Sequence, residues 1–169
     1  KIADINGLYL RKILHEKKIE LSLNEVNKSV TAFCESHNCT WKSTRFVNYT
    51  FYQIEDESGL IFTFSLYHDD LRGMHSFLEK KLSLIQKYSS DLSSKWSEMK
   101  TFLTQLGFEA SCRCSSRELE SGVEGKKISE VTGSATATHG KDLVFSFVIH
   151  PKDSTYNLKR TIKRTLGKQ

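Results

Sequence analysis

The sequence predicts an α+β protein in which a helix–antiparallel sheet–helix unit occurs twice, with a long helix joining the two units and an N-terminal helix before them. Segments 24–88 and 91–167 each have a helical pattern, then short alternating strands, then a second helical pattern. Gly59 to His68 also matches Lys141 to His150, with aromatic and aliphatic residues in register. Because tandem modules supply surfaces, this repeat favours binding over catalysis.

The N-terminal third has the pattern of a helix. Its apolar residues are spaced four, three, four and three residues apart, which is a short heptad stripe. The stripe consists of Ile19, Leu23, Val26, Val30 and Phe33. Two interpretations remain open, since residues 1–23 suit the end of a coiled coil that enters a globular head, and they equally suit a helix that only packs on the sheet.

The middle of the chain carries one apolar face with a seven-residue period. This face comprises Leu78, Ile85, Leu92, Met99 and Leu106, with Leu82, Trp96 and Leu103 at the companion position. The cluster Ser89-Ser90-Asp91 interrupts the pattern, and Ser90 or Asp91 suits the N-cap of a second helix. Either one long helix joins the units or two helices meet here. We place the first module at residues 24–90 and the second at 91–169.

Alternation predicts the strands. In the first unit we expect them around residues 41–52 and 60–67, and in the second around 108–115, 128–138 and 143–149. The aromatic residues of these strands alternate with small polar residues, which is typical of a core and not of a platform for stacking bases. They are Phe62, Phe64, Phe145 and Phe147.

Two further segments separate these elements. Arg117 to Lys127 contains Gly122 and Gly125 without an apolar pattern, and we expect a mobile loop there. Pro151 ends the last strand before a helix that begins near Tyr156.

The four cysteines do not have the spacing of a zinc knuckle or a thioredoxin-type site. Cys112 and Cys114 continue an apolar strand face and are interpreted as core thiols. Cys34, His37 and Cys39 offer three metal ligands within six residues, but a fourth would have to come from elsewhere, so we expect no metal. The few cysteines without a disulfide framework favour a reducing compartment.

Catalytic and membrane signals are weak. The sequence has none of the common nucleophile, phosphate-loop, dinucleotide or metalloprotease motifs. His68 and His150 end equivalent strands beside aspartates, an arrangement that is common without chemistry. We therefore expect no enzyme, no catalytic residues and no cofactor. No apolar run is long enough to span a membrane, and the N-terminus lacks a signal-peptide pattern. The chain begins with Lys1, so we expect it to be part of a longer protein.

The C-terminal helix has the clearest surface chemistry. One stripe is apolar, and the other side carries the candidate partner-binding residues Lys159, Arg160, Lys163 and Arg164. Four cations on one helix face can bind an acidic peptide, a nucleic-acid backbone or an anionic membrane, or they form a solvated outer face. The net charge of +5 is too mild to require nucleic acid as the partner.

With these elements in order, the chain resembles the C-terminal region of the kinetochore scaffold protein that ends in paired RWD domains. The resembling segments are the helix that ends in Asn38-Cys-Thr-Trp41, the strand Gly59 to Leu66, the strand Lys141 to Ile149, and the closing helix Asn157 to Arg164. The resemblance covers most of the chain as a pattern of elements. It implies a chromosome-segregation scaffold that docks partner subunits through a groove between the modules or through a sheet edge. The expected location is the nucleus, at the kinetochore, or the cytoplasm.

A second resemblance competes with the first. Met99 to Phe108, followed by three strands and a basic helix, looks like the kinase-associated domains at the C-termini of some Ser/Thr kinases. It implies binding of anionic lipid or regulation of a kinase. The alternative function is therefore an anion-binding module for RNA or acidic phospholipid that uses the basic last helix.

Overall fold

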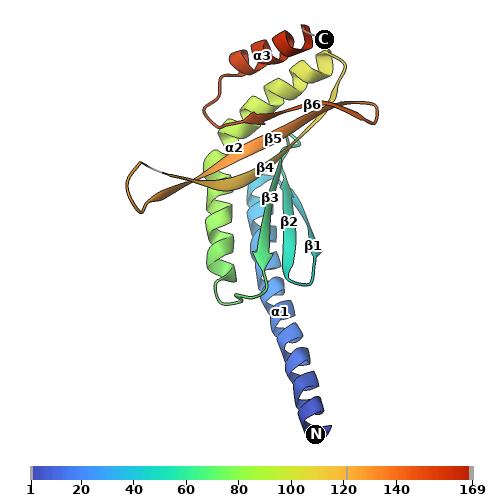
Figure 1. Cartoon of the computed structure of the whole chain (residues 1–169), viewed down its shortest axis with the longest axis vertical. Helices are drawn as coiled ribbons and strands as arrows, with labels where there is room; N and C mark the ends of the chain where they lie inside the picture. The colour runs from blue at the N-terminus through green and yellow to red at the C-terminus, as the bar shows by residue number, and fades with distance from the viewer. Residues whose placement is uncertain (1, 121, 168–169) are drawn as a thin grey trace.

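The computed structural model describes residues 2–120 and 122–167, and these form three helices and one six-stranded sheet, which confirms the α+β class (Figure 1). The elements are α1 (Ile2–His37), β1 (Thr40–Arg45), β2 (Tyr49–Glu55), β3 (Ile61–Tyr67), α2 (Met74–Gln105), β4 (Glu109–Glu120), β5 (Lys127–His139), β6 (Asp142–Ile149) and α3 (Thr155–Gly167). Each half of the chain therefore has three consecutive strands between two helices, and both halves share α2.

The sheet is continuous through both halves, with strands in the order β1-β2-β3-β4-β5-β6. Neighbouring strands pair antiparallel within each half. The halves join where β3 and β4 pair parallel, with Ile61 opposite Arg113 and Phe62 opposite Cys114. Figure 1 shows β1–β3 running steeply to β4–β6, so the sheet turns sharply at this short junction. The two units are therefore not separate bodies.

The first two helices end in the same way, which relates the two halves at the level of backbone geometry. Asn38 has φ of 54° and Gly107 has φ of 90°, the left-handed conformation that glycine and asparagine adopt most easily after a helix. The next N–H groups, of Cys39 and Phe108, donate to carbonyls five residues back at 2.9 and 3.0 Å. This Schellman arrangement stops each helix, and a strand begins two residues after Asn38 and two residues after Gly107.

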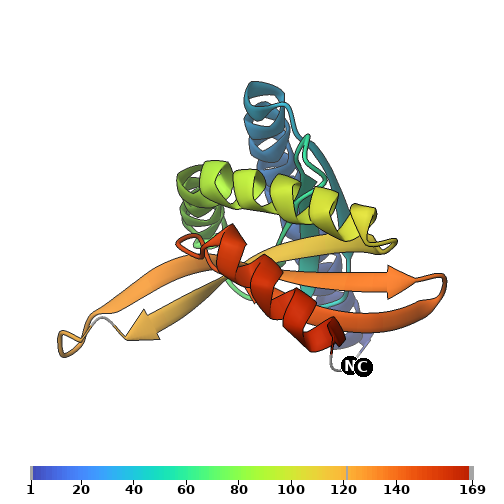
Figure 2. The ribbon, with the colours of Figure 1, turned by 90° about the horizontal axis from the view of Figure 1, so that it is seen from above.

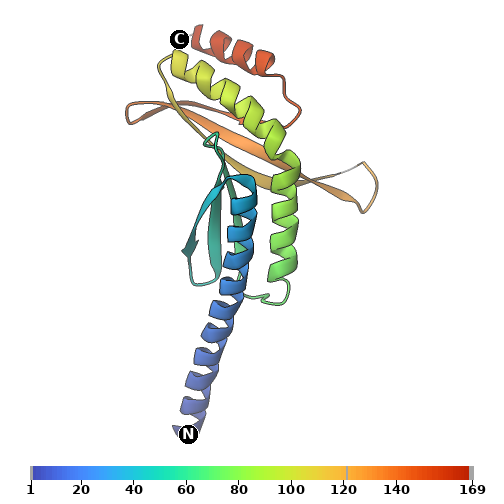
Figure 3. The same ribbon diagram turned by 180° about the vertical axis from the view of Figure 1, so that it is seen from behind.

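Helix α2 is one continuous helix, so the first of the two alternatives for the middle segment is the observed one. Figure 3 shows that α2 bends near its middle, with one half beside α1 and the other reaching α3. Its heptad face is buried except at Leu82, which is partly buried, and at Leu106, which caps the helix and is 42% exposed. The predicted boundary between residues 90 and 91 lies inside this helix, and the boundary between 23 and 24 lies inside α1.

The prediction of one strand around residues 41–52 is wrong, because the segment forms two strands, β1 and β2, with a turn between them. The N–H of Phe46 donates to the carbonyl of Tyr49 at 2.8 Å, which reverses the chain. Strand β1 has only Trp41 half-buried, and its other residues are exposed. An edge strand with one apolar contact has no alternating pattern, so the sequence did not distinguish it from its neighbour.

The prediction of a mobile loop at residues 117–127 is wrong for residues 117–120 and 127, which belong to strands. Strand β4 continues to Glu120 and β5 begins at Lys127, so only a short turn lies between them. The pairs Arg117–Glu130 and Leu119–Ile128 face each other across this hairpin. The end of the hairpin projects beyond the helices (Figure 2), so its side chains need no apolar alternation and the strand signal is lost.

Candidate functional site

A groove of about 450 Å³ lies where α1, the β2–β3 turn and the middle of α2 meet. We call it the α1–α2 groove. Its lining comes from three parts of the chain that are far apart in the sequence, and Phe62 of the lining belongs to the junction between the two halves of the sheet. The lining residues are Phe33, His37, Cys39, Asp56, Glu57, Ser58, Phe62, Ile85, Ser89, Ser90, Ser93 and Ser97.

Apolar side chains form part of the groove lining. Phe62 and Ile85 belong to the buried core, and Phe33 packs against that core. The rings of Phe33 and His37 are stacked with centroids 4.2 Å apart. His37 Nδ1 lies 2.8 Å from the carbonyl oxygen of Phe33, so Nδ1 carries the proton and donates it there. This side of the groove can receive an apolar side chain next to a fixed imidazole.

Helix α2 contributes a wall of hydroxyl groups. Ser89, Ser93 and Ser97 recur every four residues and therefore lie on one side of the helix, and Ser90 adjoins them. In the sequence Ser89 and Ser90 interrupt the apolar face and Ser90 suits an N-cap, whereas the pattern does not single out Ser93 and Ser97. The hydroxyl protons of Ser89 and Ser93 are donated within the protein, to the Gln86 carbonyl and to Asp56, so these two serines offer acceptor oxygens to a ligand. The hydroxyls of Ser90 and Ser97 can donate as well as accept, so the wall suits the backbone of a bound peptide.

Asp56 ties the β2–β3 turn together and links it to the serine wall. Its Oδ1 accepts hydrogen bonds from the backbone N–H of Ser58 at 2.9 Å, the N–H of Leu60 at 3.0 Å and the Ser58 hydroxyl at 2.6 Å. Its Oδ2 accepts from the Ser93 hydroxyl on α2. A carboxylate with this many donors holds the groove rim in place and has little capacity left to act as a base.

The thiols beside the groove are not activated. Burial, with a smaller contribution from Cys39, raises the pKa of Cys34 to about 11. Burial followed by the charges of Asp56 and Glu57 raises the pKa of Cys39. Both thiols are therefore protonated at neutral pH, and a thiol is a poor nucleophile and metal ligand. In the part of the chain that the structure describes, no three His, Cys, Asp or Glu side chains come together as a metal site.

The two cysteines of β4 are core residues, as predicted. Cys112 and Cys114 are 1% and 0% exposed and lie against Gly133 of the neighbouring strand. A hydrogen bond with Cys112, together with burial, raises the pKa of Cys114 far above its usual range. These thiols therefore pack as small apolar groups.

Neither strand-end histidine forms a proton-transfer pair with its neighbouring aspartate. His68 is buried, with Nε2 2.8 Å from the Thr50 hydroxyl and Nδ1 3.1 Å from the carbonyl oxygen of Val47. His150 has Nδ1 4.0 Å from a Glu130 carboxylate oxygen, and Asp153 accepts the backbone N–H of His150 instead of its ring. The first histidine holds a turn and the second lies in a surface charge cluster.

The predicted basic face of the C-terminal helix is divided in the structure. Lys159 Nζ lies 2.7 Å from Glu98 Oε1 on α2, and hydrogen bonds from Lys159 and then Thr155 lower the pKa of Glu98. Lys159 and Lys163 also lie over the Phe102 ring, each with Nζ 5.7 Å from the centroid. Figure 2 shows α3 beside the second half of α2, so these two cations help to hold the helices together.

The other two cations of this face remain available to a partner. Arg160 and Arg164 are exposed, and among the described residues neither forms an ion pair. None of the four predicted partner-binding residues lines the α1–α2 groove. The structure therefore contains two distinct candidate surfaces, of which only the basic one was predicted as a set of residues.

No helix in the described ranges combines the length and the apolar character that crossing a membrane requires. Comparison of the chain with models of known protein families, with curated proteins and with solved structures found no match.

Proposed function

We propose that this chain is a non-catalytic protein-binding module that docks a peptide segment of a partner in the α1–α2 groove. The observation that carries the proposal is the groove itself, which has core aromatic and aliphatic side chains in its lining and four serine hydroxyls along one wall. Peptides bind such grooves through an apolar anchor, while polar groups around the anchor fix the backbone. The partner segment is therefore expected to carry a large apolar residue.

The arrangement of the two halves supports a scaffold role. They share one sheet and α2, and helix α2 contacts elements of both halves, so a peptide in the groove would meet a rigid framework. A site whose backbone and side chains are already ordered loses little conformational entropy when a peptide binds. The order helix, three strands, helix in each half also supports the proposal that the module belongs to a kinetochore or chromosome-segregation scaffold and acts in the nucleus.

The proposal is tested by filling the groove. Ser90 and Ser97 are exposed on α2 and line the groove, so the double variant Ser90→Trp/Ser97→Trp places two indoles in it without disturbing the core. The matched control is Ser76→Trp/Ser83→Trp, which changes two exposed serines with the same spacing on the same helix outside the groove. Equal melting temperatures of the two variants would establish that both fold.

Each protein is then used to recover partners from an extract of dividing cells at two salt concentrations, with bound protein, RNA and lipid measured in parallel. We expect kinetochore subunits to be retained at the higher salt by the wild type and the control, and lost by the groove variant, because apolar anchoring is insensitive to salt. Equal retention by the groove variant would overturn the groove as the docking site. Recovery of other complexes only would overturn the kinetochore assignment.

The alternative function is anion binding by α3, and the exposure of Arg160 and Arg164 favours it. Lys163 is also exposed, although its ammonium group lies over the Phe102 ring. Binding to RNA or to anionic vesicles would weaken steeply as salt rises, because counterions are released. Changing these three residues to Gln should then abolish binding, whereas changing Lys80, Lys141 and Lys152, which are also exposed, should not. Binding that survives the α3 substitutions would exclude this function.

A further inference from the structure

The N-terminal half of α1 exposes an apolar stripe to solvent. Leu10, Leu14 and Leu21 are 58%, 57% and 66% exposed. Their spacing of four and seven residues places them on one face of the helix, as in the seam of a coiled coil. Figures 1 and 3 show this half of α1 projecting away from the sheet and the other helices. We call the three leucines the outward stripe.

The outward stripe is distinct from the stripe that anchors α1 to the body of the protein. Ile19 and Val30 are buried, at 3% and 0% exposure. Leu10 precedes Ile19 by nine residues and Leu21 precedes Val30 by nine, which is about two and a half helical turns. The leucines therefore point opposite to the anchoring stripe. Helix α1 thus has two apolar faces, and the rest of the described chain covers only one of them.

A projecting helix with this composition is expected to need a second helix. A helix segment of a few turns that stands alone in water is marginally stable, and exposed leucines at seam spacing favour packing against another helix. In the described side chains between residues 7 and 18, the one ion pair to the body joins Glu16 to Arg45 at 3.0 Å. This half of the helix therefore has little support of its own.

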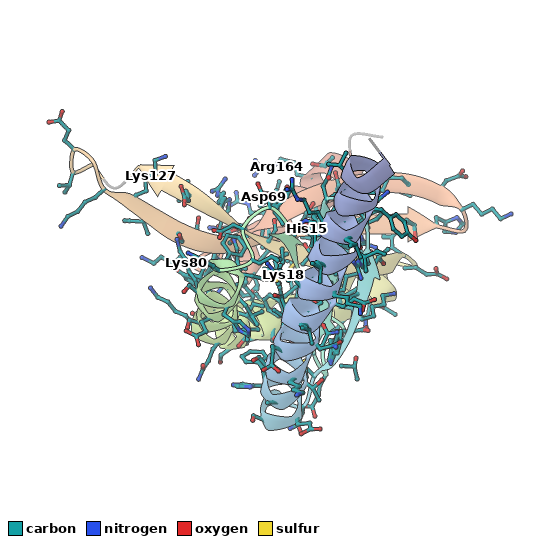
Figure 4. The ribbon with its side chains drawn as sticks, turned by 90° about the horizontal axis from the view of Figure 1, so that it is seen from below. His15, Lys18, Asp69, Lys80, Lys127 and Arg164 are labelled. Atoms are coloured by element: carbon teal, nitrogen blue, oxygen red, sulfur yellow. The ribbon has the colours of Figure 1, made fainter. Side chains whose placement is uncertain are left out.

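The charges beside the outward stripe define the partner. Arg11, Lys17 and Lys18 are exposed and flank the leucines, and Lys17 lies in the stripe between Leu14 and Leu21. Figure 4 shows Lys18 on this projecting part of α1. Of the acidic neighbours, Glu16 pairs with Arg45 and Glu25 lies 3.5 Å from Lys28, while Glu20 is exposed next to Leu21, so among the described residues the three cations face one acidic side chain that forms no ion pair. The face around the leucines is therefore basic.

We infer that the outward stripe of α1 pairs with an amphipathic helix of a partner protein, in which the apolar seam is flanked by aspartate or glutamate. Acidic flanks would neutralise Arg11 and Lys18, and an acidic seam residue would meet Lys17. A second copy of this chain is disfavoured, because a parallel pair would place Lys17 against its own copy. An anionic membrane is disfavoured because Lys17 would enter the apolar layer together with the leucines. This inference does not rest on the α1–α2 groove.

The test uses two synthetic helical peptides as probes. Both have leucine heptads, and they differ only in having glutamate or lysine at the flanking positions. Binding to the full chain is measured by fluorescence anisotropy at two salt concentrations. We expect the glutamate peptide to bind at least about tenfold more tightly than the lysine peptide. Its affinity should fall as the salt concentration rises.

Two variants separate the apolar and the charged contributions. The variant Leu10→Gln/Leu14→Gln/Leu21→Gln keeps good helix formers at exposed sites. It should lower the affinity for the glutamate peptide by about tenfold for each leucine that the seam buries. Arg11→Glu/Lys17→Glu/Lys18→Glu should reverse the preference between the two peptides. The control, Lys80→Glu/Lys141→Glu/Lys152→Glu, makes the same change of charge away from α1 and should leave the preference unchanged.

Other outcomes would overturn the inference. Equal affinity for the two peptides, or binding of the glutamate peptide that survives the leucine substitutions, would show that the stripe and its charges do not select the partner. A dimer in analytical ultracentrifugation that the leucine substitutions dissolve would assign the stripe to a second copy of the chain. Binding to vesicles with anionic lipid that depends on the same leucines would assign it to a membrane surface.

Discussion

Replacing Asp56 by alanine should destabilise the protein far more than its position in a surface turn suggests. The substitution removes the acceptor of the Ser58 and Leu60 N–H groups and of the Ser93 hydroxyl. Leu60 is only 1% exposed, so water has poor access to its freed N–H. A buried donor without a partner costs about 1–3 kcal/mol, and lost bonds to a charged acceptor add to this, so we expect about 2–4 kcal/mol in total.

The smaller substitutions divide this cost. Ser93→Ala removes only the link between the turn and α2 and should cost about 1 kcal/mol, because the carboxylate keeps its backbone donors. Asp56→Asn keeps an oxygen for the turn and should lie between the two alanine variants. The double variant Asp56→Ala/Ser93→Ala should cost less than the sum of the two single substitutions, since they share one bond.

The assay is urea unfolding followed by circular dichroism, with the free energy of unfolding extrapolated to water. The control is Glu57→Ala, a neighbouring exposed carboxylate, which should change the free energy by less than about 0.5 kcal/mol. If Asp56→Ala cost no more than Ser93→Ala, the turn bonds would contribute nothing and the reasoning from the buried N–H would be refuted.

Two further predictions concern the core. Gly133→Ala should lower the free energy of unfolding by about 1–3 kcal/mol in thermal unfolding, because a Cβ there would lie 2.7 Å from the Cys112 sulfur. Adding Cys112→Ala should recover part of this loss, and no recovery would point to another source of strain. Burial raises the pKa of Tyr52 to about 12, so the folded protein keeps a proton that the unfolded chain releases above about pH 10. The wild type should therefore lose about 1.4 kcal/mol of stability per pH unit between pH 10 and 12, relative to the Tyr52→Phe variant. At neutral pH the variant should be the less stable protein by about 1 kcal/mol, because it lacks the 2.7 Å hydrogen bond from Tyr52 to Asn27. Parallel pH profiles of the two proteins would contradict this.

Local patterns in the sequence predicted the elements whose burial is regular. The seven-residue period of α2, the alternation of β3 and the small apolar face of β4 each correspond to one buried face of one element. Such a pattern records which side of a helix or strand avoids water, and it needs no knowledge of the partner. Strand β1 and the outer part of the β4–β5 hairpin were missed because their side chains are mostly exposed and leave no such record.

The basic helix shows how contacts between elements change the meaning of a local pattern. The sequence placed Lys159 and Lys163 on a polar side, together with Arg160 and Arg164. The structure turns the two lysines towards Phe102, and Lys159 also pairs with Glu98. The ends of long cationic side chains can reach a neighbouring helix, so their availability depends on what packs beside them.

By itself, the sequence determined the α+β class, the order of the helices and strands apart from β1, and most of the core, because these follow from local periodicity and from the residues that end each helix. Only the tertiary structure decided that β3 and β4 join the halves into one sheet and that α1, the β2–β3 turn and α2 enclose a groove. The physical reason is that both features arise from contacts between distant segments. The parallel pairing of β3 and β4 involves two residues of each strand, and the walls of the groove are as far apart in the chain as Phe33 and Ser97. Local side-chain patterns do not encode such contacts.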